Sequence, residues 1–322
     1  MNYDVIALGE LLIDFTLAGV SDTQNLLLEA CPGGAPCNVL SMLTKLGRKT
    51  GFIGKVGDDQ FGHMLCNILQ DMRIDTTSLL LDQEVNTTLA FVHTFADGNR
   101  DFSFYRNPGA DMMLQPDEVD EKYLKQTKIF HFGTLSMTDE PVREATKKAT
   151  KIAKDNGIMI SFDPNLRPPL WKDLREAKAR ANYGFSVCDI LKISDNEVEF
   201  YTGLEDYDAG ILHLQKTYGT PLIFLTLGKQ GSRAYFNDLR VEVPGFSVNT
   251  IETTGAGDTF CACILDGVLT HGIEDLSYET LENMLFFANA AAALITTKRG
   301  ALLSMPSKEE VMRLKCTLEF CR

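Results

Sequence analysis

The chain has 322 residues, of which 44% are hydrophobic and 23% are charged, and its formal net charge is −13 at pH 7. This balance is typical of a soluble globular protein, and the negative charge argues against a nucleic-acid partner. No run of about 18 apolar residues is present, so the sequence predicts neither a membrane-spanning helix nor a membrane partner. The eight cysteines lack the spacing of a zinc site, and their scatter fits a cytoplasmic protein.

Strand-like runs alternate with amphipathic helical runs along most of the chain. The expected main strands are Val5–Gly9, Lys49–Val56, Ile129–Gly133, Ile158–Asp163, Ile190–Ile193 and Leu222–Leu227. The helical runs between them include Val39–Leu46, Gly62–Met72, Pro141–Asn156 and Leu174–Tyr183. This alternation predicts an α/β fold with a mainly parallel central sheet and helices on its faces. No linker divides the chain, so we expect one domain over residues 1–322.

Three β-rich segments do not fit the alternation. Thr87–Phe95 and Asp101–Arg106 flank Ala96–Arg100, which contains an Asp-Gly pair typical of a hairpin turn. Leu11–Leu17 follows the first expected strand. Together these segments predict a small sheet over the carboxyl ends of the main strands, where α/β folds bind ligands.

This small sheet would form a lid, built from segments inserted at about 11–31 and 86–107. Its apolar face or edge needs cover, since an exposed one favours association. We therefore expect a homodimer through the lid.

Two segments near the N-terminus carry polar groups suited to a polyol. Asp14 lies where the chain crosses from the first strand to the lid, and a carboxylate accepts hydrogen bonds from pairs of sugar hydroxyls. Gly33 and Gly34 let a ligand approach the backbone, and Asn38 can both donate and accept hydrogen bonds. A solvated turn acid and an ordinary glycine-rich loop are the alternative interpretations.

Polar motifs follow three successive expected strands. They are Asp163–Arg167, Asn196–Glu199 and Thr226–Gly231. Any one of them could be an ordinary turn, but three at neighbouring strand ends predict a ligand crevice. Neither a Walker A sequence nor a dinucleotide-binding glycine motif is present.

The run Thr253–Phe260 places a glycine-rich turn directly before an apolar helical pattern. Unpaired N–H groups and the helix dipole favour an anion at such a terminus, most naturally a phosphate in transfer. Asp258 is then best explained as a base that accepts a hydroxyl proton. The alternative is a loop with an Asp N-cap.

Together these motifs resemble the ribokinase-like (pfkB) family of carbohydrate kinases over essentially the whole chain. The resemblance rests on the ordered pair Gly33–Asn38 and Thr253–Asp258. Within the family it is closest to fructokinases, through Phe52–Asp59, Phe104–Asp111 and Asp163–Trp171. Ribokinases usually carry Lys where this chain has Ala35.

The resemblance implies a ribokinase-like three-layer α/β/α fold with a β-sheet lid. It implies ATP-dependent phosphorylation of a sugar hydroxymethyl, with fructose converted to fructose 6-phosphate. A 2-keto-3-deoxygluconate kinase or another sugar kinase of the family is the alternative, and a ribose or nucleoside kinase is less favoured. A non-catalytic sugar-sensing or scaffolding relative is disfavoured because Asp258 and the adjacent glycines are kept.

The resemblance also implies roles for individual residues. Asp258 would be the general base, and the anion hole would be formed by Gly255, Ala256 and Gly257. The sugar hydroxyls would be held by Asp14, Gly33, Gly34 and Asn38, and Arg106 and Arg167 would lie near the sugar or the phosphate. The nucleotide would contact Asn196, Thr226, Gly228, Gly231 and Asn289, and Glu199 would organise Mg²⁺ through water.

One position departs from the family pattern. Glu252 stands where the family commonly has Asp. In many relatives the acid at this position helps to hold a monovalent cation. The implied K⁺ site would comprise Glu252, Thr254, Gly300 and Ser304. Because Glu is longer than Asp, we expect only weak to moderate activation by K⁺.

Overall fold

The computed structural model describes residues 1–94 and 100–319. The larger of its two sheets has nine strands in the order β13-β12-β11-β10-β9-β8-β1-β4-β5. The strands are β1 (Tyr3–Leu8), β4 (Thr50–Gly57), β5 (Asp75–Asp82), β8 (Thr127–Gly133), β9 (Met159–Asp163), β10 (Ile190–Ser194), β11 (Leu222–Thr226), β12 (Gly231–Phe236) and β13 (Leu239–Pro244). Neighbours from β11 to β5 pair in parallel, and β12 and β13 pair antiparallel at one edge. The expected mainly parallel sheet is confirmed.

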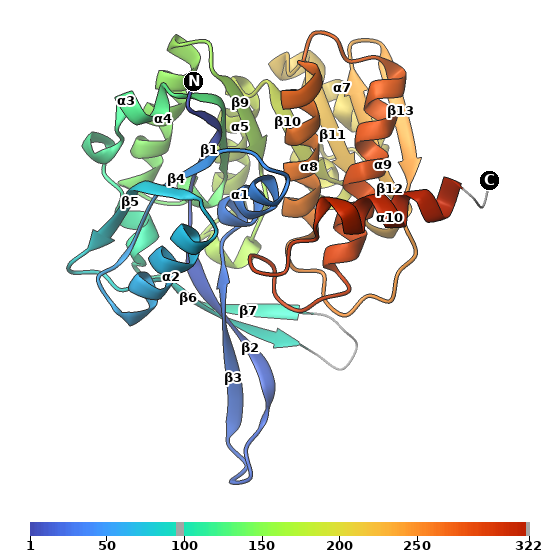
Figure 1. Ribbon diagram of the computed structural model, residues 1–322. Coiled ribbons are helices and arrows are strands. Elements are labelled where there is room, and N and C mark those ends of the chain that lie inside the picture. The colour runs from blue at the N-terminus through green and yellow to red at the C-terminus, as the bar shows by residue number, and fades with distance from the viewer. Residues whose placement is uncertain (95–99, 320–322) are drawn as a thin grey trace.

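Helices cover both faces of this sheet (Figure 1). One layer contains α1 (Ala35–Lys45), α2 (Gln60–Asp71), α8 (Ala256–His271), α9 (Tyr278–Ile295) and α10 (Lys308–Glu319). The other contains α3 (Glu121–Leu124), α4 (Val142–Asp155), α5 (Leu174–Val187), α6 (Asp195–Thr202) and α7 (Tyr207–Tyr218). Each layer closes its own hydrophobic core, which gives the expected three-layer α/β/α fold. Across the described ranges, no helix has the length and apolarity needed to cross a membrane.

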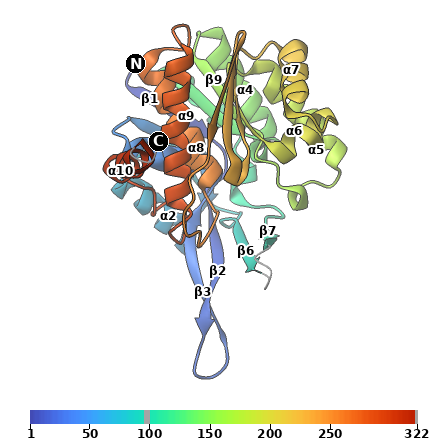
Figure 2. The same cartoon turned by 90° about the vertical axis from the view of Figure 1, so that its right-hand side faces the viewer.

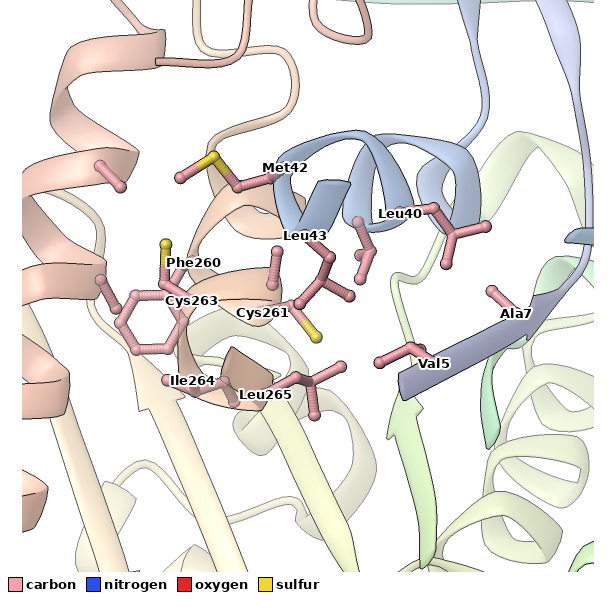
Figure 3. Close-up of a cluster of buried hydrophobic side chains, with 14 of the residues drawn as sticks. Val5, Ala7, Leu40, Met42, Leu43, Phe260, Cys261, Cys263, Ile264 and Leu265 are labelled. Atoms are coloured by element: carbon pink, nitrogen blue, oxygen red, sulfur yellow. The ribbon is translucent and has the colours of Figure 1, made fainter. Parts of the chain in front are cut away.

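The packing of α1 against α8 matters most for the site (Figure 3). Leu40 and Leu43 on α1 and the run Phe260–Leu265 on α8 are all buried, because the two helices pack against each other over the sheet and α9 packs against α8. An almost continuous apolar run is what a helix buried on most sides requires. This packing holds the first turns of α1 and α8 next to each other at the carboxyl edge of the sheet.

The second sheet has four strands in the order β3-β2-β6-β7. These strands are β2 (Leu12–Val20), β3 (Leu26–Gly33), β6 (Leu89–Thr94) and β7 (Arg100–Tyr105). The expected antiparallel pairing of the two later segments is present, with Leu89 opposite Tyr105. Phe95 and residues 96–99 of the expected turn lie outside the described residues. The β2–β3 hairpin projects away from the body of the molecule (Figures 1 and 2).

Sequence reasoning did not predict β3, β5, β12 and β13. The β3 strand, Leu26–Gly33, is exposed over its first four residues and partly buried over the next three, so its sequence lacks a clear alternation. The β12–β13 hairpin follows directly on a motif that we interpreted as a ligand-binding loop. Its turn residue Asn237 has a φ of 51°, a left-handed conformation that Asn adopts more readily than most residues.

Candidate active site

A cleft of about 980 Å³ lies at the carboxyl edge of the main sheet and extends to the lid. Most of the predicted site residues line it, although they come from six separate parts of the chain. These residues are Asp14, Gly34, Asn38, Arg167, Asn196, Thr226, Glu252, Thr254, Gly255, Gly257 and Asp258. Phe104 on β7 also lines the cleft, so the lid sheet contributes a wall to it.

The α8 helix begins at the floor of the cleft. Its N-cap, Gly255, has a φ of 79°, and a Cβ at this position would lie 2.7 Å from the Cβ of Ala301. Both the left-handed backbone and the lack of space require glycine here. The N–H of Ala256 donates to the carbonyl of Thr253 at 3.3 Å. The N–H groups of the next two residues, Gly257 and Asp258, have no partner within the helix, and both residues line the cleft, as an anion site requires.

Asp258 lies in this first turn and is only 8% exposed. Its Oδ2 accepts a hydrogen bond of 2.8 Å from Nδ2 of Asn38, on the first turn of α1. The other amide atom, Oδ1 of Asn38, is buried and has no hydrogen-bond partner among the described residues. A buried acceptor without a hydrogen-bond partner is costly, so this oxygen is suited to accept a hydrogen bond from a hydroxyl of a bound ligand.

Burial raises the pKa of Asp258 to about 6, and the nearby carboxylate of Asp163 adds to this effect. The hydrogen bond from Asn38 and the charges of Lys192 and Arg167 act in the opposite direction. The carboxyl is therefore ionised near neutral pH but remains basic enough to take a proton. This is the pKa range expected of a general base.

Further acids line the cleft. Burial raises the pKa of Asp14 to about 6, with Arg167 lowering it and Glu252 and Asp258 raising it. Glu10 is also buried, and its Oε1 accepts a 2.8 Å hydrogen bond from the N–H of Ala35. This bond fixes the Gly33–Gly34 turn, in which the φ of Gly34 is 128° and a side chain would strike the Glu10 carbonyl.

Two predicted residues belong to buried networks outside the cleft lining. The Arg106 guanidinium donates to Asp111 at 2.7 Å, to the hydroxyl of Thr138 at 3.0 Å and to the carbonyl of Leu135 at 3.1 Å. Asn289 accepts a 2.8 Å hydrogen bond from Ser232 and donates to two carbonyls that end β13. Both residues connect structural elements: Arg106 ties the end of β7 to the body, and Asn289 ties α9 to the β12–β13 hairpin.

The predicted metal residue does not line the cleft either. Glu199 is exposed on α6, whereas Glu197 is buried and lines the cleft. The Glu197 carboxylate accepts from the N–H of Leu166 at 2.7 Å and from the N–H and hydroxyl of Ser194 at 2.9 Å. Two residues along a helix turn the side chain by about 200°, so only one of these glutamates can face the cleft.

Other predicted residues lie in the turn after β11 and in the 300–304 loop. Gly228 and Gly231 bracket the short turn after β11 and have positive φ angles, but neither lines the cleft. The Glu252 Oε2 accepts a 3.2 Å hydrogen bond from the N–H of Gly300, which brings two members of the predicted K⁺ site together. The Ser304 hydroxyl donates to the carbonyl of Arg299 at 2.7 Å, in the same loop.

Sequence reasoning also missed a cation of the cleft, Lys192 on β10. Its ammonium is buried and lies 3.0 Å from Oδ2 of Asp163. A lysine within a short apolar strand, Ile-Leu-Lys-Ile, was the available signal, because a strand buried on both faces rarely carries an unpaired charge.

Comparison with known proteins agrees with this geometry. The model of the pfkB family of carbohydrate kinases matches residues 2–308. The probable fructokinase-2 of Arabidopsis thaliana is 41% identical over 310 residues, covering 96% of this chain and 94% of that protein. The chain therefore belongs to the pfkB family of carbohydrate kinases.

Solved structures show the same likeness. The fructokinase of Xylella fastidiosa with bound ATP superposes with a TM-score of 0.91 and 29% identity, covering 99% of this chain and 100% of that one. The fructokinase of Vibrio cholerae O395, solved with fructose, ADP and a calcium ion, gives a TM-score of 0.87 and 28% identity over 98% and 99% of the two chains.

Proposed function

We propose that this chain is an ATP-dependent fructokinase that converts fructose to fructose 6-phosphate. The observation that carries the proposal is the buried carboxylate of Asp258 in the glycine-opened first turn of α8, facing the cleft. The catalytic unit is the single domain of residues 1–322, with the lid strands inserted in it. Fructokinases among the relatives and the solved structures support this assignment.

The chemical step is a phosphoryl transfer from ATP to the sugar. The 6-hydroxyl oxygen of fructose forms a new bond to the γ-phosphorus, and its proton passes to Asp258. The bond between that phosphorus and the β–γ bridging oxygen breaks, and ADP leaves with the electron pair. Backbone N–H groups from Gly255 to Gly257 stabilise the charge on the transferred group, since such a reaction depends on positioning and charge neutralisation.

The charges of the cleft favour a neutral ketose over a sugar acid. Asp14 lines the cleft together with Glu252 and Asp258, and Arg167 and Lys192 are the cations among the described residues that line it. Lys192 is paired with Asp163, and the charge of Arg167 lowers the pKa values of Asp14 and Asp258. A carboxylate substrate such as 2-keto-3-deoxygluconate would meet repulsion from these three acids.

ATP is the second substrate, and we propose that it arrives with Mg²⁺. Within residues 1–94 and 100–319 no cluster of three or more His, Cys, Asp or Glu side chains is arranged to hold a metal. Mg²⁺ keeps several waters and takes few protein carboxylates. The predicted Glu199 does not line the cleft, so we propose that Glu197, which lines it next to Asn196, acts on such an ion through water, since its carboxylate oxygens already accept hydrogen bonds. When bound, Mg²⁺ neutralises phosphate charge.

A turnover assay tests the proposed function. Purified protein with Mg-ATP should release ADP with fructose, and the product should be fructose 6-phosphate. Asp258→Asn should lower kcat by roughly 100- to 10,000-fold, the usual contribution of a general base, while ATP still binds. Turnover of 2-keto-3-deoxygluconate without turnover of fructose would contradict the substrate, and full activity of Asp258→Asn would contradict the base.

We further propose that a monovalent cation binds beside the anion hole, through Glu252 and the 300–304 loop. The hydrogen bond from the N–H of Gly300 to Glu252 supports this site, but it also occupies part of the carboxylate. K⁺ should therefore raise kcat only weakly to moderately over choline, and Glu252→Gln should remove the difference. Equal rates in K⁺, Na⁺ and choline buffers would contradict this proposal.

We propose that two copies of the chain associate through the lid. Leu17, Val20 and Leu26–Leu28 of the β2–β3 hairpin are between 43% and 68% exposed. An apolar surface of this kind on a projecting sheet marks an interface, and a second copy presents the same face.

We also propose that the protein works in the cytoplasm, since the six described cysteines are free thiols, as a reducing compartment favours.

Light scattering at low concentration should give the mass of a dimer, and Leu27→Lys should shift it to a monomer. Leu212→Lys is the matched control, because Leu212 on α7 is 48% exposed, as is Leu27, but lies away from the lid. A wild-type monomer, or a dimer that both variants retain, would contradict the lid interface.

A further inference from the structure

Lys192 is a buried cation next to the first turn of α8. It lies on β10 and is only 6% exposed, yet it lines the cleft. Its ammonium nitrogen is 3.0 Å from Oδ2 and 3.3 Å from Oδ1 of Asp163, at the end of β9. Asp163 is itself 3% exposed and is fixed by a 3.1 Å hydrogen bond from the N–H of Asn165.

The ammonium lies against the proposed anion hole. A Cβ on Gly257 would be 3.1 Å from Nζ of Lys192, so the lysine head occupies the space beside the first turn of α8. The lack of a side chain at Gly257 lets the cation and the backbone N–H groups share one surface of the cleft. Its charge also reaches Asp258, whose pKa it lowers.

Lys192 remains charged despite its burial. Burial alone lowers the pKa of a lysine, but the carboxylates of Asp163 and Glu197 outweigh it and raise the pKa above the ordinary value. An ammonium has three N–H donors. Within the described chain its hydrogen-bonding partner is the Asp163 carboxylate, which leaves donor capacity for a ligand in the cleft.

A buried ion pair can serve structure alone, and the chain holds an example. Lys55 on β4 is also 6% exposed, and it pairs with Glu118 at 2.7 Å and with Asp82 at 3.7 Å. It also donates to the carbonyl of Met113, so that its partners surround it, and it does not line the cleft. Lys192 differs in having its pair at one side and the anion hole at the other.

We propose that Lys192 is a further catalytic residue, which donates a hydrogen bond to a non-bridging oxygen of the phosphoryl group in transfer, and that Asp163 is the positioning residue that holds it there. The proposal rests on the proposed kinase function. No proton or covalent bond of Lys192 changes in the step. Its fixed charge opposes the negative charge that the transferred group carries next to Asp258, where a carboxylate would otherwise repel the phosphate.

The test compares Lys192→Met, Lys192→Arg and Lys55→Met with the wild type in the fructose assay. Lys192→Met should lower kcat by roughly 100- to 1,000-fold, the usual effect of removing one transition-state donor, with a KM for fructose within a few-fold of the wild-type value. Lys192→Arg should restore part of kcat because it keeps the charge. Lys55→Met should keep wild-type kcat even if it lowers the melting temperature.

A second readout separates catalysis from structure. Without Lys192 the pKa of Asp258 should rise, so the acidic limb of the kcat/KM profile should move to higher pH in Lys192→Met and not in Lys55→Met. Near-wild-type kcat in a folded Lys192→Met overturns the proposal. So does a loss of kcat in Lys192→Met that leaves the acidic limb in place and that Lys192→Arg shows to the same extent.

A further variant covers the case in which Lys192→Met does not fold. Asp163→Asn keeps the ammonium of Lys192 but weakens the ion pair that holds it. A fall of about tenfold or more in the kcat of Asp163→Asn supports the proposal, and an unchanged kcat overturns it. A wild-type protein that does not phosphorylate fructose refutes the proposed function itself, whereas an active wild type matched by Lys192→Met refutes only the role of Lys192.

Discussion

The first turn of α8 holds a buried carboxylate, Asp258, beside backbone N–H groups that have no partner within the helix. These groups and the helix dipole attract an anion, while the carboxylate repels one. The two needs are reconciled by geometry: Asn38 holds the carboxylate from the α1 side, and Lys192 lies on the strand side of the same turn. The packing of α1 and α8 against the sheet fixes all three positions.

The wider fold brings the substrates to this turn. Parallel strands end at one edge, so the segments that follow β1, β9, β10 and β11 meet there although they are far apart in sequence. The lid strands add Phe104 as an apolar wall. Arg106 anchors the lid through its bonds to Asp111 and Thr138, and thus supports the cleft without lining it.

The sequence predicts the parts of the site that are encoded locally. Asp258 and Asn38 lie in short motifs whose glycines and helix starts have a physical meaning by themselves, and the fold follows from alternating runs. The roles of Arg106 and Asn289 depend on partners such as Asp111 and Ser232, which only tertiary packing brings near them.

A motif also could not distinguish Glu197 from Glu199, because the direction of each side chain depends on how α6 lies on the sheet. Lys192 was missed because its partner Asp163 lies on the neighbouring strand β9, 29 residues earlier in the sequence.

Asp258 is held ionised in a buried site at a cost in stability, and unfolding at several pH values measures that cost directly. Its pKa is about 6 in the fold, above the ordinary 3.8, so its contribution to stability is present below pH 4 and is lost as the pH rises through 6. Asp258→Asn should therefore gain stability over the wild type between pH 4 and 7.5, by roughly 3 kcal/mol for this change in pKa. A difference in unfolding free energy that stays constant over that range would contradict the account.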